Sequence, residues 1–380
     1  FSDVVKSIYL EVKSEKYVRK ELRPAGIMIG AIPSQCGNTL VRQSLAGHPQ
    51  VMMIEEYGSH FNSNLYSICI RLAEEQAGDI VSTFRMLYLR EASDVDENAA
   101  SIGFDKEKFY HKIEELLSEG GHFTSSELFI VFHLAYEAGF GREYMNLSSV
   151  IIYWEPHQWD RQIVKEWAYW LGSMDIKCFV LKMVRNRYIY AGSYMRNSKG
   201  KNGFWAVQGS DFTWQEKRGG AFDERVVTFE DLKCRPREML SDLCEWLGIA
   251  FDDVLLDTTY HGVRSFYDGT ITGFDVKPVY NLSEEYFSAF DRIRICLIQG
   301  IYQKQYGYPY VSCLEFTRRE LQEMFLKSFR WEKIPKIAEK MTENRIRYMH
   351  ACAAKLLWKG RFAEIMKVNE DQDLEMVYLQ

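Results

Sequence analysis

The sequence lacks several features that would assign it to a class of protein at once. No apolar run reaches the roughly 18 residues that a membrane-spanning helix requires. No basic stripe is present either, because 47 Lys and Arg residues are mixed with 53 Asp and Glu residues, for a net charge of −6. This balance argues against nucleic acid as a partner. No internal repeat is visible.

Metal and disulfide signatures are also missing. The eight cysteines contain no Cys-x-x-Cys pair, and no cluster of His, Asp and Glu has the spacing of metal ligands. The sequence therefore predicts no metal, and scattered free thiols fit the reducing cytoplasm, where we expect the protein to be located. The chain begins at Phe1 rather than Met, which leaves a preceding targeting segment open.

What is present suits one large α/β domain with an appendage. The 380 residues are 47% hydrophobic, which is ample for such a core. Strand-like runs alternate with helical ones, and this alternation predicts a three-layer α/β/α fold around a central parallel sheet. The expected strands cover residues 27–32, 150–154, 177–184 and 225–229, and the expected helices 161–171, 188–196, 236–247 and 283–305.

Two helical regions accompany this core. Between the first two expected strands, residues 60–146 read as helices separated by polar loops, at 65–73, 80–89, 106–117 and 125–138. After residue 312 an amphipathic helical pattern continues to about residue 368. We therefore expect an α/β domain over residues 1–312, with a cap inserted at 60–146, and a helical C-terminal extension over 313–380.

The stretch from Ile27 to Pro49 predicts an anion-binding turn. An apolar strand leads into a turn with Pro33 and Gly37, and a helix follows that Gly47 and Pro49 end. Free N–H groups and the helix dipole favour phosphate at such a place. The stretch has no GxxxxGK[ST] pattern, so it is not a Walker loop. A purely structural turn is the alternative.

Three motifs in order carry a resemblance to a known family. The turn resembles the P-loop-like phosphosulfate-binding loop of the sulfotransferases, where a strand leads into Pro-Arg-Ser-Gly-Thr-Thr-Leu. Arg185 after Val184, with Ser193 eight residues later, is similar to the family's second signature, whose Arg and Ser hold a 3′-phosphate. Residues 227–232 and 243–249 resemble the family's Val-x-Tyr-Glu-Asp-Leu and Leu-x-x-Phe-Leu-Gly-Ile runs. Residues 255–259, 282–284 and 306–309 follow its closing segments.

The resemblance implies the sulfotransferase fold and a specific activity. Such a protein would move a sulfuryl group from 3′-phosphoadenosine 5′-phosphosulfate (PAPS) to an acceptor hydroxyl by in-line displacement. Glu56, the second residue of the pair after His48-Pro49, stands at the place of a general base in related sulfotransferases. The candidate residues for binding PAPS are Gln35, Cys36, Gly37, Asn38, Thr39, Leu40, Arg42, Arg185 and Ser193.

Two departures from the family pattern concern charge. Gln35 stands where the loop has a basic residue, and Trp154 where the family has a Lys at the end of the next strand. Cations there would neutralise charge as sulfate leaves. The candidates to supply the missing positive charge are Arg42, His157 and Lys182. The predicted catalytic residues are Glu56, His157 and Lys182.

Other classes of function stay open. A sulfotransferase-fold protein that binds a nucleotide without transfer, or acts as a scaffold, fits the lost cations. A P-loop kinase or hydrolase is less well supported, since the Walker Lys is missing. The sequence does not choose among a sugar, a sterol and a phenol as acceptor, and it leaves a homo-oligomer open.

Overall fold

The computed structural model describes most of the chain. The described residues are 20–32, 36–54, 60–74, 82, 103–118, 122–144, 146–156, 161–172, 176–198, 206–207, 222–260, 263–264, 274, 283–330, 355, 357 and 360–361. The chain divides into two compact units. The first comprises residues 1–183 and 216–278, and the second comprises residues 184–215 and 279–380. The domain boundaries expected from the sequence stay predictions.

A five-stranded sheet forms the centre of the fold. Its order is β2-β3-β1-β4-β5, and β1 pairs in parallel with β3 and β4, as β2 does with β3. Every residue of the first four strands is buried, as a sheet covered on both faces requires. The predicted α/β fold with a central parallel sheet is confirmed. The strands are β1 (Gly26–Ala31), β2 (Val51–Met53), β3 (Ile151–Trp154), β4 (Cys178–Val184) and β5 (Asp223–Thr228).

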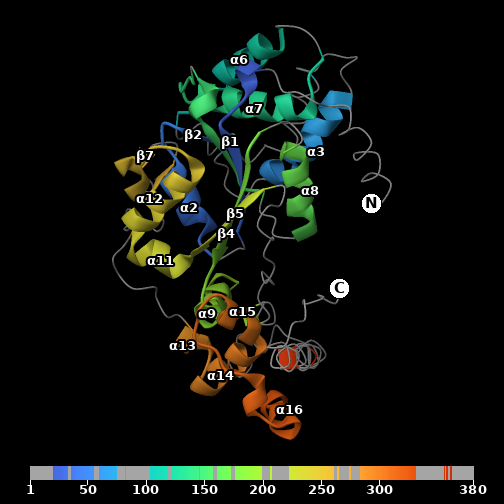
Figure 1. Cartoon of the computed structure of the whole chain (residues 1–380), viewed down its shortest axis with the longest axis vertical. Coiled ribbons are helices and arrows are strands. Elements are labelled where there is room, and N and C mark those ends of the chain that lie inside the picture. Colours follow the sequence, from blue (N-terminus) through green and yellow to red (C-terminus); the bar gives the residue numbers. More distant parts are fainter. Residues whose placement is uncertain are drawn as a thin grey trace, which may run out of the picture. The chain divides into compact units, whose positions relative to one another are not determined.

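Helices of the first unit cover both faces of the sheet, as Figure 1 shows. On one side lie α2 (Asn38–Leu45), α11 (Phe229–Cys234) and α12 (Pro236–Leu247). On the other lie α3 (His60–Glu74) and α8 (Arg161–Gly172). The helices α6 (Lys106–Ser118) and α7 (Ser125–Gly139) come from the predicted cap. Short elements complete the unit: η1 (Lys20–Leu22), η2 (Leu147–Ser149), η3 (Asp253–Leu256) and the antiparallel pair β6 (Thr259–Tyr260) and β7 (Val263–Arg264).

Helix ends follow local signals where these are strong. Thr124 and Glu127 form a capping box at the start of α7, each side chain accepting a hydrogen bond from the other residue's N–H. Pro236 opens α12, and Gly248, with a φ of 74°, ends it. The bounds predicted for this helix, 236–247, are confirmed.

One expectation was wrong, and one strand was missed. Residues 283–305 form three helices instead of one, because Ser288 and Asp291 make a capping box that starts a new helix. β2 was not expected as a strand, since three residues carry too little pattern. The expected helix at 80–89 lies outside the described residues except for Ser82. The helices are α13 (Ser283–Tyr286), α14 (Ala289–Ile298) and α15 (Gly300–Gln305).

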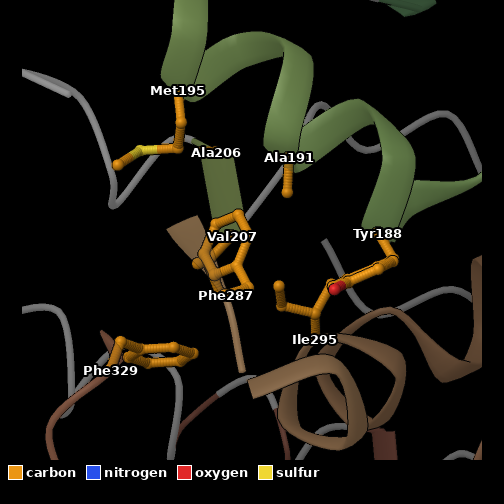
Figure 2. Packing of buried hydrophobic residues seen from close by; sticks show 8 residues of the cluster. All are labelled: Tyr188, Ala191, Met195, Ala206, Val207, Phe287, Ile295 and Phe329. Carbon is orange, nitrogen blue, oxygen red and sulfur yellow. The ribbon is translucent and has the colours of Figure 1, made fainter. Parts of the chain in front are cut away.

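The second unit has its own apolar core. Figure 2 shows Tyr188 of α9 (Arg187–Asn197) pointing toward Ile295 of α14, with Val207 and Phe287 close by. This packing holds α9, which carries Ser193, against α14. Beyond it lie η4 (Cys313–Glu315) and α16 (Arg318–Leu326).

Buried Arg294 joins α14 to the last turn of α16 and to the chain that follows it. Its guanidinium forms an ion pair with Asp291 and donates to the carbonyls of Met324 and Ser328 at 3.3 and 3.2 Å. No helix in the described part of the chain is long and apolar enough to span a membrane.

Candidate functional site

The turn between β1 and α2, residues 36–40, is called the cradle below. Gly37 has a φ of 102°, in the left-handed region, and a Cβ there would lie 2.6 Å from the Phe229 ring and 3.0 Å from Met183 Cε. Only glycine fits such a position. Cys36 is buried, and Asn38, Thr39 and Leu40 form the first turn of α2.

The start of α2 leaves its N–H groups to other partners. No side chain caps this helix, so its first N–H groups are ready donors for an anion. Gln35, predicted to join them, lies outside the described residues with Pro33 and Ser34.

The strand order places the cradle where open α/β sheets bind ligands. After β1 the chain moves toward β2 and β3, whereas after β4 it moves to β5 on the other side. β1 and β4 are neighbours, with Ala31 opposite Lys182. The order of the sheet reverses between these two strands, and ligands of such folds bind outside the carboxyl ends of the strands at that point.

Three buried polar side chains lie at the end of β3 and on α2, the helix that starts in the cradle. Tyr153, Arg42 and Glu155 are 2%, 4% and 4% exposed. Tyr153 is the second-last residue of β3, and Glu155 directly follows the strand. Burial and, after it, the charge of Glu155 raise the pKa of Tyr153 well above its usual value, while Arg42 lowers it. Both charges therefore act on this phenol. We call these three residues the polar cluster.

Trp154 points to the opposite face and belongs to the core. Its ring is 4.6 Å from that of Trp167 of α8 and meets the ring of Phe129 of α7 edge-on at 5.3 Å. The place where the family has a Lys is thus filled by an aromatic packing residue. Alternation along β3 is the signal that separates Trp154 from its neighbours Tyr153 and Glu155, which sequence reasoning did not select.

Lys182 is fully buried in β4, and its charge is balanced. Its Nζ lies 2.9 Å from Oε1 of Glu224 on β5. Sequence reasoning missed this carboxylate, which is 42 residues away. A catalytic role for Lys182 stays a prediction.

In the second unit, Arg185 and Ser193, the pair that the family resemblance selects, lie in contact. Arg185 directly follows β4 and is buried, and its Nη1 donates a hydrogen bond to Ser193 Oγ at 3.3 Å. Asn186 caps α9, accepting from the N–H groups of Tyr188 and Ile189 at 3.0 and 3.3 Å. The cap fixes the start of the helix, so Ser193 is two turns along on the side of Arg185.

Helix α15 holds the backbone around Arg185. The Arg185 N–H donates to Tyr302 Oη at 3.1 Å, and the Arg187 N–H donates to Gln303 Oε1 at 3.2 Å. The buried Arg187 guanidinium lies 3.7 Å from the centre of the Tyr302 ring. Arg187 is therefore a packed cation that supports Arg185. No motif in the sequence marks Tyr302 or Gln303 as a residue that supports the site.

Two predicted catalytic residues, Glu56 and His157, lie outside the described residues. Within the described ranges, no three His, Cys, Asp or Glu side chains gather as a metal site would require. The cradle and the polar cluster belong to the first unit, and Arg185 and Ser193 belong to the second.

Comparisons with known proteins give limited matches. No family model matches the chain, and no curated protein does. Among solved structures, the sulfotransferase domain of the olefin synthase from Synechococcus PCC 7002 is 15% identical, over 78% of this chain and 99% of that one, with a TM-score of 0.41. The sulfotransferase domain from the curacin biosynthetic pathway is 13% identical, over 76% and 99%, with a TM-score of 0.36. Both proteins are sulfotransferase domains, and the sulfotransferases are the family that the sequence resembles. The scores are low, so the proposals below rest on this chain's own residues.

Proposed function

We propose that this protein is a PAPS-dependent sulfotransferase that acts on a hydroxyl of a small-molecule, lipid or glycan acceptor. The observation that carries the proposal is the contact between Arg185 and Ser193. A guanidinium and a hydroxyl that face each other offer several donors to one phosphate group, and the guanidinium keeps its charge at any relevant pH. These two residues would hold the 3′-phosphate.

The cradle suits the other end of the same nucleotide. N–H groups from Cys36 to Leu40, an uncapped helix start and a position that only glycine fits are typical of phosphate-binding turns. Arg42, buried on α2, adds a positive charge. When bound, PAPS supplies the sulfuryl group that is transferred. Glu56 would take the proton of the acceptor hydroxyl, with His157 and Lys182 as further catalytic candidates.

Calorimetry with two nucleotides tests the proposal. We expect adenosine 3′,5′-bisphosphate to bind about tenfold or more tightly than adenosine 5′-phosphate, since a hydrogen bond to a charged group supports such a difference. Arg185→Ala should remove most of it. Arg196→Ala, which changes an exposed Arg on the same helix, is the matched control and should keep it. Equal affinities of the unaltered protein for the two nucleotides would refute the assignment.

A second candidate is a nucleotide-binding protein of this fold without transfer. The pairing of Lys182 with Glu224 favours it, because a neutralised Lys offers less charge to a departing phosphate. A panel of phenols, sterols and glycans with labelled PAPS separates the two candidates. Sulfate transfer to any acceptor supports the enzyme, whereas tight nucleotide binding with no transfer to any of them supports the second candidate.

A further inference from the structure

The hydroxyl of Tyr153 is fully buried and has no hydrogen-bond partner among the residues that the structure describes. The hydroxyl of the partly buried Tyr144, in the same unit, by comparison donates to the carbonyl of Val51 at 3.0 Å. A buried hydroxyl without a partner lowers stability, so its presence calls for an explanation such as a ligand. Phenylalanine would fill the same space without this cost.

The position of the hydroxyl relates it to the cradle. It lies over Gly30, the second-last residue of β1, so closely that a Cβ on Gly30 would be 2.6 Å from the oxygen. β1 leads directly into the cradle. The missing side chain of Gly30 thus makes room for a polar group at the carboxyl end of the strand, which is the ligand-binding edge of such a sheet.

The neighbours of the hydroxyl indicate what kind of ligand it would meet. The phenol keeps its proton, because burial and Glu155 raise its pKa well above the usual value, and it can therefore donate. Arg42 is on the buried face of α2, and side chains of a helix lean toward its N-terminus, here toward the cradle. Arg42 and Glu155 carry opposite charges, which offset each other near the hydroxyl. An anion bound there would accept hydrogen bonds from two donors, Tyr153 and Arg42.

We propose that the Tyr153 hydroxyl, together with Arg42, donates a hydrogen bond to an oxyanion bound in the cradle, which under the proposed function is the 5′-phosphate group of the nucleotide. The assignment of this group rests on the proposed function. In the family, basic residues stand at the positions of Gln35 and Trp154. Tyr153 and Arg42, on the α2 side of the sheet, would supply hydrogen-bond donors in place of those missing cations.

The first test measures thermal unfolding of the protein without added ligand. Tyr153→Phe removes a hydroxyl that has no partner, so the unfolding temperature should stay the same or rise. Tyr144→Phe is the matched control: it removes a hydroxyl that donates to Val51, and should lower the unfolding temperature by about 2 °C. An equal fall in Tyr153→Phe would show that the hydroxyl is bonded within the protein, and would overturn the proposal.

The second test measures binding by calorimetry. Tyr153→Phe should weaken adenosine 3′,5′-bisphosphate about tenfold and leave adenosine 3′-phosphate, which lacks the 5′-group, unchanged. Tyr144→Phe should change neither. If Tyr153→Phe binds the bisphosphate as tightly as the unaltered protein, or loses both nucleotides equally, the hydroxyl does not bond to the 5′-phosphate and the proposal is wrong.

Inorganic sulfate separates this proposal from the proposed function. If the unaltered protein binds no adenosine nucleotide but sulfate raises its unfolding temperature, and Tyr153→Phe abolishes that rise, the oxyanion site stands and the sulfotransferase assignment falls. If neither nucleotide nor sulfate has an effect on the unaltered protein, both are refuted.

Discussion

At the scale of single residues, Gly37 sets the geometry of the cradle. Its φ of 102° and the nearness of Phe229 and Met183 leave no room for a side chain. Gly141 also has a positive φ, of 72°, but no atom lies within 4 Å of the place of its Cβ. The two glycines therefore separate the effect of backbone conformation from the effect of crowding.

We predict that Gly37→Ala lowers the free energy of unfolding by about 2–4 kcal/mol, since strain and overpacking add. Gly141→Ala should cost only about 1 kcal/mol, from the backbone alone. Urea unfolding followed by circular dichroism measures both. Equal losses in the two variants would show that the cradle can move away from Phe229.

Glu56 is the residue on which transfer should depend most. We predict that Glu56→Gln keeps nucleotide affinity, because a general base faces the acceptor, and lowers turnover by about a hundredfold or more. Glu55→Gln, the neighbouring change, should have a much smaller effect. Initial rates with labelled PAPS and an acceptor found by screening measure this. Turnover at the parent rate, where chemistry limits it, would exclude Glu56 and direct the search to His157.

At the scale of elements, α7 and β2 are joined through a buried carboxylate. Glu137 of α7 accepts a hydrogen bond from the N–H of Met53, at the end of β2, at 3.0 Å. Its other oxygen is 3.0 Å from Nε of Arg142. Burial raises the pKa of Glu137 to about 7, although Arg142 and the Met53 N–H act in the opposite direction. Two residues after Met53 the chain reaches Glu55 and Glu56.

We predict that stability falls between about pH 4.5 and pH 7 through this group. Its pKa is higher in the folded protein, so the folded state holds a proton that the unfolded state has released, and raising the pH favours unfolding. Glu137→Gln keeps an acceptor for Met53 and removes the titration. It should flatten this fall and gain stability over the unaltered protein on the order of 1–3 kcal/mol above pH 7. Unfolding curves from pH 4 to pH 8 measure it.

The exposed pair of Lys112 and Glu115 on α6 gives a control. Glu115→Gln should change stability little at any pH, because exposed ion pairs contribute little. If Glu137→Gln loses stability equally across the range, Arg142 holds the carboxylate in its charged form and the titration lies below the range.

At the scale of the whole molecule, the predicted nucleotide-binding residues are shared between two compact units. The cradle precedes β2 in the first unit, and Arg185 and Ser193 follow β4 in the second. Different contacts fix the two sets of residues. In the first unit, the side chains packed around Gly37 fix the cradle. In the second unit, α15 and the apolar core around Tyr188 fix Arg185 and Ser193.

We predict that adenosine 3′,5′-bisphosphate at a hundredfold excess over its dissociation constant stabilises the protein by about 2.7 kcal/mol. Amide hydrogen exchange should slow in two places, residues 36–45 and residues 185–193, because each phosphate group orders one of them. Adenosine 5′-phosphate should slow exchange only in the first. If the bisphosphate slows amide exchange in only one of these two segments, the assignment of one nucleotide to both segments is wrong.

The sequence by itself determined what depends on neighbours along the chain. Pro236 and Gly248 fixed the bounds of α12, and the alternation of strands and helices fixed the fold class. Arg185 and Ser193 were selected through the resemblance to the family signature, and in the structure they lie within hydrogen-bond distance of each other. Caps, turns and periodicity act over a few residues, so a single sequence displays them directly.

Only the tertiary structure decided what depends on distant strands. The partner of Lys182 is 42 residues away, and Tyr153 meets Gly30 from a strand more than a hundred positions further on. The sequence offered Lys182 as a free cation and did not select Tyr153. Which face of a strand a residue takes, and which strand lies beside it, are set by the order and register of the sheet. Those follow from packing both faces of the sheet at once, which no local pattern contains.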